Sequence, residues 1–177
     1  MTTSPFDLQP ELVGETLSLR PLCREGFDGL YAAASDPETW AAHPATDRYK
    51  EDVFSKYFDF LLNNGGTLVI LDQQQDRIIG CSRYYVGPDV PDSISIGFTF
   101  LQHAYWGGDT NRELKKLMLG HAFETFSEVW FHIDPNNIRS QKATAKLGAK
   151  HRYDATIGVS GTPGNWMCFS LSDRDWC

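Results

Sequence analysis

A glycine-rich turn between an apolar strand and a helix is the part of this sequence best suited to binding an anion. Residues 100–113 read FLQHAYWGGDTNRE, so the strand ends near Leu101, glycines follow at 107 and 108, and a helix begins near Thr110. Glycines let the backbone approach a ligand closely, and the first turn of a helix leaves unpaired amide hydrogens that point toward an anion. The stretch therefore predicts a pyrophosphate site; an ordinary strand-to-helix turn is the alternative.

Two familiar phosphate motifs do not fit this turn. No Gly-Lys-Ser or Gly-Lys-Thr follows the glycines, which excludes a Walker loop. The preceding strands form a meander, which excludes the dinucleotide fingerprint of a Rossmann fold. Thr110 and Glu113 have the spacing of a capping box, and this spacing places the start of the helix near Thr110.

Several titratable side chains are candidates for a general base. His103 follows the strand directly and titrates in the right range, with an exposed loop histidine as the alternative. His132 and Asp134 lie on or at the end of the strand 129–133, each with a structural role as the alternative. His121 lies on an apolar helix face and is predicted to be a core residue. Four aromatic residues either line a substrate pocket or belong to the core: Trp40, Tyr84, Tyr85 and Tyr105.

Basic residues gather beside the glycine-rich turn although the chain as a whole is acidic, with a net charge of -7. A site for an anionic ligand needs such a local concentration of positive charge, and a solvated helix face is the alternative interpretation. Two segments supply the residues: Arg112, Lys115 and Lys116 in one, and Arg139, Lys142 and Lys146 in the other.

The composition favours one compact domain over residues 1–177 and excludes several classes of protein. The acidic balance argues against a nucleic-acid surface, and no apolar run reaches the length of a membrane span. The first residues show no secretion signal. The four cysteines show no CxxC pair and no metal-like spacing with histidine. We therefore expect reduced thiols, no metal, no membrane association and a cytoplasmic location.

The hydrophobic periodicity predicts an α/β protein with a mixed sheet. A helix between the strands 93–101 and 129–133 lets these two lie parallel, whereas hairpin-like links make the earlier strands an antiparallel meander. Within 93–101, Ile94, Ile96, Phe98 and Phe100 are expected to face one way. The predicted strands are 16–22, 67–71, 77–86, 93–101, 129–133, 150–159 and 166–171. The predicted helices are 27–34, 53–62, 110–126 and 136–147.

This element order, together with IGFTFLQHAYWGGDTNRELKKLMLGHAFE and VWFHIDPNNIRSQKATAKLGA, resembles the GNAT superfamily of N-acetyltransferases. The resemblance covers residues 16–171 and is closest to the branch that includes ribosomal-protein N-terminal alanine acetyltransferases. It implies a mostly antiparallel sheet whose fourth and fifth predicted strands are parallel and splayed, with helices on both faces. It also implies direct transfer of acetyl from acetyl-CoA to an amine in a ternary complex.

The resemblance further assigns roles to individual positions. The Leu101 amide faces the thioester oxygen, Asn137 touches the coenzyme arm, and the Ser140 hydroxyl lies near the sulfur as the candidate acid. The candidate base, His103, comes from its position beside the turn and not from the resemblance. The residues implied in coenzyme binding are Phe100, Leu101, Trp106, Gly107, Gly108, Asp109, Thr110, Asn111, Arg112, Asn137 and Ser140.

The sequence also departs from the family pattern. In the loop, Trp106 replaces a basic residue, Asp109 replaces the second glycine and Asn111 replaces a small residue. Ser95 stands where many relatives carry an acidic residue, and Thr144 stands where many carry a tyrosine that acts as an acid. The coenzyme-binding features are therefore retained, while the usual acid and base are partly missing.

Two alternatives to an enzyme stay open from the sequence. The missing acid and base motivate a non-catalytic acyl-CoA-binding or regulatory module on the same fold, and an unrelated α/β interaction domain is the other. For an enzyme, the acceptor is an amine, and the acidic balance mildly favours a cationic one. A homodimer is left open.

Overall fold

The computed structural model describes residues 5–176, so that Cys177 lies outside the described part. Four helices accompany the sheet: α1 (Phe27–Ala34), α2 (Glu51–Asn64), α3 (Thr110–Phe123) and α4 (Ile138–Lys146). Short 3-10 turns cover Arg24–Gly26, Pro37–Thr39 and His103–Tyr105. The strands are β1 (Leu12–Val13), β2 (Leu17–Pro21), β3 (Thr67–Asp72), β4 (Arg77–Tyr85), β5 (Ile94–Leu101), β6 (Glu128–Ile133), β7 (Lys150–Ile157) and β8 (Gly164–Ser172).

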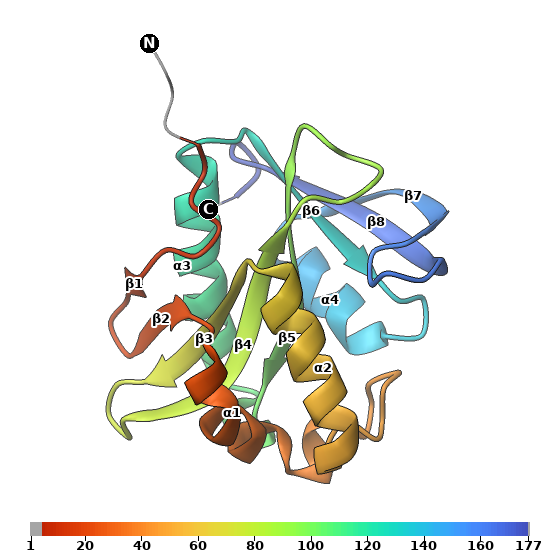
Figure 1. Ribbon diagram of the computed structural model, residues 1–177. Coiled ribbons are helices and arrows are strands. Elements are labelled where there is room, and N and C mark those ends of the chain that lie inside the picture. Colours follow the sequence, from red (N-terminus) through yellow and green to blue (C-terminus); the bar gives the residue numbers. More distant parts are fainter. Residues whose placement is uncertain (1–4, 177) are drawn as a thin grey trace.

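The strands form one sheet in the order β1-β2-β3-β4-β5-β6-β8-β7. Every neighbouring pair is antiparallel except β5 and β6, which are parallel. The predicted mixed α/β sheet with one parallel pair is therefore confirmed (Figure 1). Among residues 5–176, no helix has both the length and the apolar character that crossing a bilayer requires.

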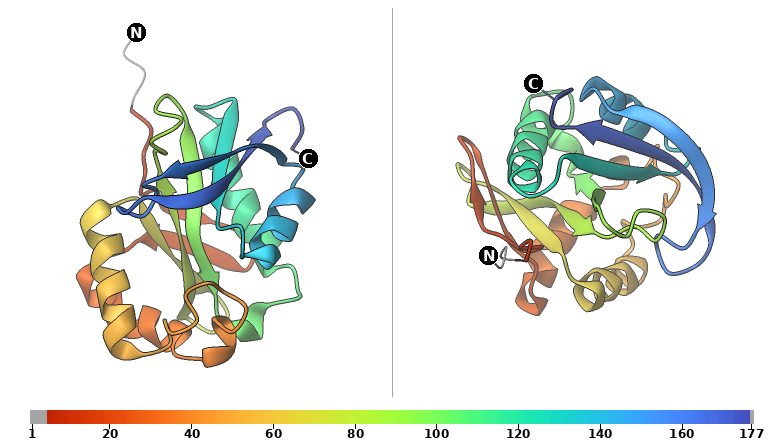
Figure 2. Two further views of the ribbon diagram at one scale, coloured as in Figure 1. Left: turned by 90° about the vertical axis from the view of Figure 1, so that its right-hand side faces the viewer. Right: turned by 90° about the horizontal axis from the view of Figure 1, so that it is seen from above.

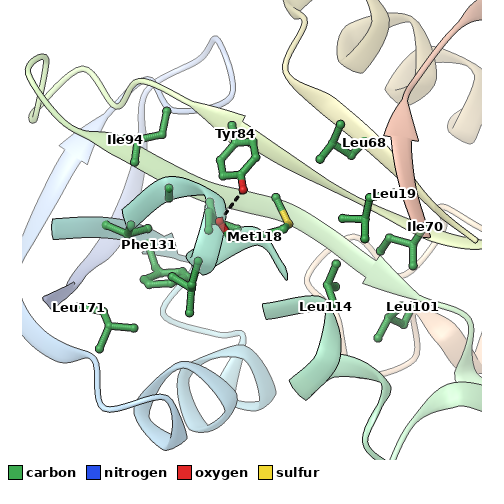
Figure 3. Close-up of a cluster of buried hydrophobic side chains, with 14 of the residues drawn as sticks. Leu19, Leu68, Ile70, Tyr84, Ile94, Leu101, Leu114, Met118, Phe131 and Leu171 are labelled. Carbon is green, nitrogen blue, oxygen red and sulfur yellow. Dashed lines mark hydrogen bonds between the residues drawn. The ribbon is translucent and has the colours of Figure 1, made fainter. Parts of the chain in front are cut away.

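Helices cover both faces of the sheet and bury one hydrophobic cluster under each (Figure 2). On one side, α2 contributes Phe54, Phe58 and Leu61, which share a face because they lie four and three residues apart. On the other side, Leu114 and Met118 of α3 pack on the sheet, and the Tyr84 hydroxyl donates to the Met118 carbonyl at 2.5 Å (Figure 3). These two layers fix the strands between them.

The parallel pair separates soon after it forms. Only Ile94 with Val129 and Ser95 with Trp130 are paired between β5 and β6. Beyond them each strand continues without pairing to the other, so the backbone edges that face each other lack a strand partner. Such edges are available to a ligand.

A β-bulge in β5 contradicts part of the predicted alternation. Ile94 and Ile96 pack in the cluster under α3, as expected, but Phe98 and Phe100 pack in the cluster under α1 and α2. The register between β4 and β5 shifts between Cys81 and Arg83, and Phe98 has a φ of 53°. One extra residue therefore moves every later side chain of β5 to the other face.

Candidate active site

A cavity of about 460 Å³ lies where β5 and β6 separate. Its walls are the diverging strands, the first turns of α3 and α4, the segment 39–48 before α2, and the tip of the β7–β8 hairpin. Two features of the fold give the cavity this shape: the bulge bends β5, and the helix between β5 and β6 makes these two strands parallel.

The edge of β5 that faces the cavity presents the Leu101 amide. Gln102 donates its N–H to Ile79 of β4 at 2.8 Å, so the backbone groups of Leu101 face the opposite edge, toward β6. The Leu101 carbonyl accepts a hydrogen bond from Trp106 Nε1 at 2.8 Å. The Leu101 N–H is left directed at the gap, where it can donate to a carbonyl oxygen of a ligand.

The glycine-rich turn has the backbone freedom that an anion site requires. Gly107 has a φ of 78°, and a side-chain carbon added at Gly108 would meet no atom within 4 Å. The helix α3 begins at Thr110, as predicted, but the predicted capping box is absent. The Glu113 carboxylate instead accepts hydrogen bonds from the Thr16 hydroxyl and the Thr16 and Leu17 backbone N–H groups. The Asp109 side chain at the N-cap makes no capping hydrogen bond, so within the described part of the chain the first amides of α3 stay uncapped.

Arg139 of α4 places a positive charge beside this turn. The Arg139 guanidinium lies 3.3 Å from the centre of the Trp106 ring, and both residues line the cavity. Stacking on an indole holds a guanidinium in place and leaves its N–H donors free at its edges. Arg139 therefore supplies the charge that the sequence lacks at position 106. Lys115 is buried, whereas four further predicted basic residues of the two helices are exposed: Arg112, Lys116, Lys142 and Lys146.

Helix α4 brings three polar side chains to the cavity. Asn137 is its N-cap, and its Oδ1 accepts the Ser140 N–H at 3.2 Å, which leaves the Asn137 amide NH2 free to donate. Ser140 is half-buried and Thr144, one turn later, is buried; all three line the cavity. Ser140 and Thr144 thus present two hydroxyls on the same helix face.

Lys115 is a buried cation in the same cavity. Its Nζ lies 3.5 Å from the Thr99 hydroxyl and 5.9 Å from the centre of the Phe131 ring, between the two separated strands. Burial lowers the pKa of Lys115 to about 8. No carboxylate among residues 5–176 pairs with it. An unpaired buried ammonium is costly, and such groups are more frequent at functional sites than elsewhere.

The segment 39–48 forms the opposite wall of the cavity, on the side of α1 and α2. Trp40 is buried and donates its Nε1–H to Ala34. The Arg48 guanidinium lies 3.8 Å from the centre of the Tyr57 ring and 5.6 Å from that of Trp40. Burial, with a contribution from Arg48, lowers the pKa of His43 to about 4, so this histidine is neutral near pH 7. The wall therefore carries a cation held on aromatic rings.

The cavity brings together six of the residues predicted to bind the coenzyme: Phe100, Leu101, Trp106, Asn111, Asn137 and Ser140. The five others of the predicted set, residues 107–110 and 112, do not line the cavity and belong to the turn and first helical turn beside it. His103 does not line the cavity either. It is exposed, its ring packs 4.7 Å from that of Trp106, and its N–H donates to the Thr39 hydroxyl. The structure therefore places His103 beside the cavity wall rather than in it, and its role as the base stays a prediction.

Of the alternatives, His121 lies outside the cavity and bonds the Asp7 carbonyl, as a structural histidine would. Asp134 lines the cavity, and its carboxylate caps the Asn136 N–H. His132 also lines the cavity, together with Tyr85 of β4. The sequence predicts Tyr85 only as a pocket or core residue and gives no signal for Arg48, because neither stands in a local motif.

One cluster has the spacing of a metal site: the possible ligand atoms of Asp89, His132 and Cys168 lie within 4.8 Å of one another. Both ring nitrogens of His132 are already engaged by hydrogen bonds to Tyr85 and Asp89. Burial raises the pKa of the Cys168 thiol to about 12, so it is protonated near neutral pH. These three groups are therefore suited to hydrogen bonding and poorly suited to a metal ion.

Comparison with known proteins places this geometry in context. A family model described as an acetyltransferase (GNAT) domain matches residues 16–150, while no curated protein matches the chain significantly. A GCN5-related N-acetyltransferase from Brucella melitensis has a TM-score of 0.79 at 16% identity, over 97% of this chain and 82% of that chain. RimJ from Mycobacterium smegmatis, in complex with CoA-disulfide, gives 0.65 at 14% identity, over 94% and 87%. The ribosomal-protein-S5-alanine acetyltransferase from Vibrio fischeri gives 0.64 at 16%, over 95% and 99%.

Proposed function

Because the chain belongs to the GNAT acetyltransferase family, as its sequence predicted, we propose that it transfers an acetyl group from acetyl-CoA to the nitrogen of an amine. The acceptor is a protein N-terminus or a small-molecule amine, and the amine attacks the thioester directly in a ternary complex. No cysteine lines the cavity among residues 5–176, which supports direct attack over an acyl-cysteine intermediate. We also propose that the protein is located in the cytoplasm.

The observation that carries the proposal is the gap between β5 and β6 with the Leu101 N–H directed into it. A pantetheine arm laid in this gap would pair with the free strand edge, as another strand would. The thioester oxygen would then lie where Leu101 can donate to it. A donor aimed at the developing oxyanion lowers the barrier to acyl transfer.

The phosphates of the coenzyme would lie at residues 106–111. The uncapped amides at the start of α3 and the guanidinium of Arg139 both favour an anion there. The Asn137 amide and Lys115 would face the coenzyme arm further into the gap. Positive charge beside the reacting sulfur also favours its departure as a thiolate, and Ser140 would pass a proton to it.

The charge of the cavity wall narrows the choice of acceptor. Among residues 5–176, three cations line the cavity, Arg48, Lys115 and Arg139, against the single carboxylate of Asp134. Arg139 and Lys115 lie on the proposed coenzyme side, whereas Arg48 faces the acceptor side with no carboxylate partner among residues 5–176. This balance favours an amine that also carries an anionic group over a polycation, so the cationic acceptor expected from net charge has less support.

Release of free thiol from acetyl-CoA tests the function directly. The assay would use amines matched in size, with and without a carboxylate, including an amino acid and its amide. Thiol release that depends on an amine supports the enzyme, and a preference for the carboxylate supports the role of Arg48. Tight acetyl-CoA binding without thiol release from any amine favours the non-catalytic acyl-CoA module. Absence of coenzyme binding in calorimetry favours an unrelated interaction domain.

A further inference from the structure

Tyr85, His132 and Asp89 form a continuous hydrogen-bonded chain that starts at the cavity wall. The Tyr85 hydroxyl lies 2.7 Å from His132 Nδ1, and His132 Nε2 lies 2.8 Å from Asp89 Oδ1. The imidazole is fully buried, and only 6% of Tyr85 is exposed. Beyond Asp89, the Tyr153 hydroxyl donates to its second oxygen at 2.6 Å and lies at the surface.

The chemistry of these groups fixes the direction of the hydrogen bonds. Burial raises the pKa of Asp89, but hydrogen bonds from Tyr153 and His132 outweigh it and hold the pKa below its usual value. Asp89 is therefore an ionised carboxylate, which can only accept, so His132 must donate from Nε2. In a neutral imidazole the other nitrogen is then an acceptor, and the Tyr85 hydroxyl donates to it. Tyr85 itself lines the cavity, so its oxygen can also accept a hydrogen bond from a ligand there.

Tyr85 also lies next to the strand position at which this sequence lacks the acidic residue that many relatives carry. In the register of β4 and β5, Tyr85 lies directly opposite Ser95, and cross-strand partners share a face of the sheet. The Ser95 hydroxyl is buried without a hydrogen-bond partner among residues 5–176. A side-chain carbon added at Gly97 would lie 3.3 Å from the Tyr85 oxygen. The hydroxyl thus lies over the β5 backbone just before the bulge, on the acceptor side of the gap.

We propose that Tyr85, backed by His132 and Asp89, removes a proton from the acceptor ammonium before it attacks the thioester. This inference rests on the proposed amine acetylation. Tyr85 is the proposed catalytic residue, since it lines the cavity and heads the chain of hydrogen bonds, whereas His132 and Asp89 act through it. The arrangement follows the logic of a hydroxyl, an imidazole and a carboxylate in series, here used to take a proton from a substrate.

The proton balance of the step is complete. The ammonium gives one proton to the Tyr85 oxygen as Tyr85 passes its own proton to His132 Nδ1, and the Asp89 carboxylate stabilises the imidazolium that results. The neutral amine then forms the N–C bond to the acetyl carbon, the C–S bond breaks, and the second amine proton reaches the sulfur. One ammonium and one thioester give one amide, one thiol and one proton, which leaves His132 for solvent between turnovers.

Other titratable and charged groups around the chain of hydrogen bonds are compatible with this role. The Arg83 guanidinium lies 5.5 Å from the centre of the Tyr85 ring, but burial raises the pKa of Tyr85 well above its usual value. Tyr85 therefore passes protons as a neutral phenol and does not act as a phenolate. Cys168 of β8, with its thiol protonated, and the exposed Arg152 and Asp154 of β7 also lie near the chain of hydrogen bonds.

A structural role is the competing explanation, because the same hydrogen bonds fasten the β4–β5 loop to β6 and β7. The two explanations differ in pH dependence. An amine is protonated below its own pKa, near 8 for an α-amine and ~10.4 for a lysine side chain, so a base is needed there and is superfluous above it. Loss of a purely structural contact lowers stability or activity without following the ionisation of the acceptor.

The test measures kcat/KM for one amine from about pH 7 to above the pKa of that amine, with saturating acetyl-CoA. Tyr85→Phe should lower kcat/KM about 100-fold near neutral pH, and the deficit should shrink as the pH rises through the amine pKa. Acetyl-CoA affinity in calorimetry should be unchanged. His132→Gln should show the same pattern, and Asp89→Asn a smaller loss with the same pH dependence.

Tyr84→Phe is the matched control, since it removes a buried hydroxyl from the adjacent residue on the opposite face, and it should leave the pH profile unchanged. Tyr85→Phe activity within a few-fold of wild type, or a deficit constant across pH, would overturn the proposal. These results are interpretable only if the wild type acetylates an amine. A wild type that binds acetyl-CoA and releases no thiol contradicts the proposed function itself, and with it the step that Tyr85 is proposed to perform.

Discussion

Replacing Lys115 by methionine should make the protein more stable at neutral pH and a poorer enzyme. Methionine keeps an unbranched side chain that fits beside Phe131 but removes the buried charge. The lost hydrogen bond to Thr99 is long, at 3.5 Å, and the Thr99 hydroxyl keeps its contact with Ser82 at 2.7 Å. The removal of charge therefore dominates the change in stability.

The magnitude follows from the pKa of Lys115. Burial lowers this pKa from 10.5 to about 8, a difference of roughly 2.5 pKa units, and each unit corresponds to ~1.4 kcal/mol. Well below pH ~8 the lysine is charged in both the folded and unfolded states, so the full cost of about 3.5 kcal/mol is present. As the pH rises toward 10.5, the folded protein releases its proton while the unfolded chain keeps it, and the cost disappears.

Urea unfolding at about pH 7 and about pH 10 measures this effect as the difference between variant and wild type. The expected gain for Lys115→Met is about 2–3 kcal/mol at the lower pH, or roughly 5–10 °C in Tm, and under ~1 kcal/mol at the higher pH. Lys116→Met, at the exposed neighbouring position, should change little at either pH.

The functional half of the prediction uses the same variants. Loss of the ammonium should lower kcat/KM for acetyl-CoA about 10-fold or more, since a charged hydrogen bond contributes ~1.5–3 kcal/mol. A gain that is equal at both pH values would show that the charge of Lys115 is not the cause. No gain at neutral pH would show that the lysine is already satisfied in the free protein, and the argument for an anionic ligand in the gap would fail.

Three further predictions concern the coenzyme. Gly108→Val should weaken acetyl-CoA binding without loss of stability, because only a phosphate on the loop amides would meet the added side chain; equal affinity in calorimetry contradicts the loop site. Arg139→Glu should raise KM for acetyl-CoA and flatten its salt dependence, more than Lys142→Glu on the same helix does. Ser140→Ala should lower kcat more than it weakens acetyl-CoA binding, because the proton is needed in the transition state. If Thr144→Val alone slows turnover, Thr144 is the acid.

Features written in contiguous residues could be predicted from the sequence. The start of α3 at Thr110 follows from the glycines and polar residues before it, and the parallel pair follows from the helix between 93–101 and 129–133. Asn137 lies at the start of α4 because an asparagine caps a helix that begins beside it. Each inference depends only on neighbours in the chain.

Features that depend on a distant partner were missed or misread. Glu113 has the spacing of a capping box, yet its carboxylate bonds Thr16 and Leu17 across the sheet, which offer more donors than a single helix N–H. Phe98 continues an apparent alternation, but a one-residue bulge reverses its face, and no local pattern marks that residue as extra. The sequence places Lys115 in the basic cluster beside the turn, but helical spacing does not show that the residue is buried under that face.

The proposed base illustrates both limits and shows where the signal lay. Its hydrogen bonds join residues 47 and 43 positions apart, so no motif contains them. The sequence nevertheless shows Ser95 where many relatives carry an acidic residue. When a strand position lacks its usual functional group, the residues beside it in the sheet are candidates for that role. Tyr85 occupies the adjacent position on β4, on the same face, and His132 lies two residues beyond Trp130, the partner of Ser95 on β6. Once the strand register is known, the absence of an acidic residue at position 95 points to its neighbour Tyr85 as the proposed base.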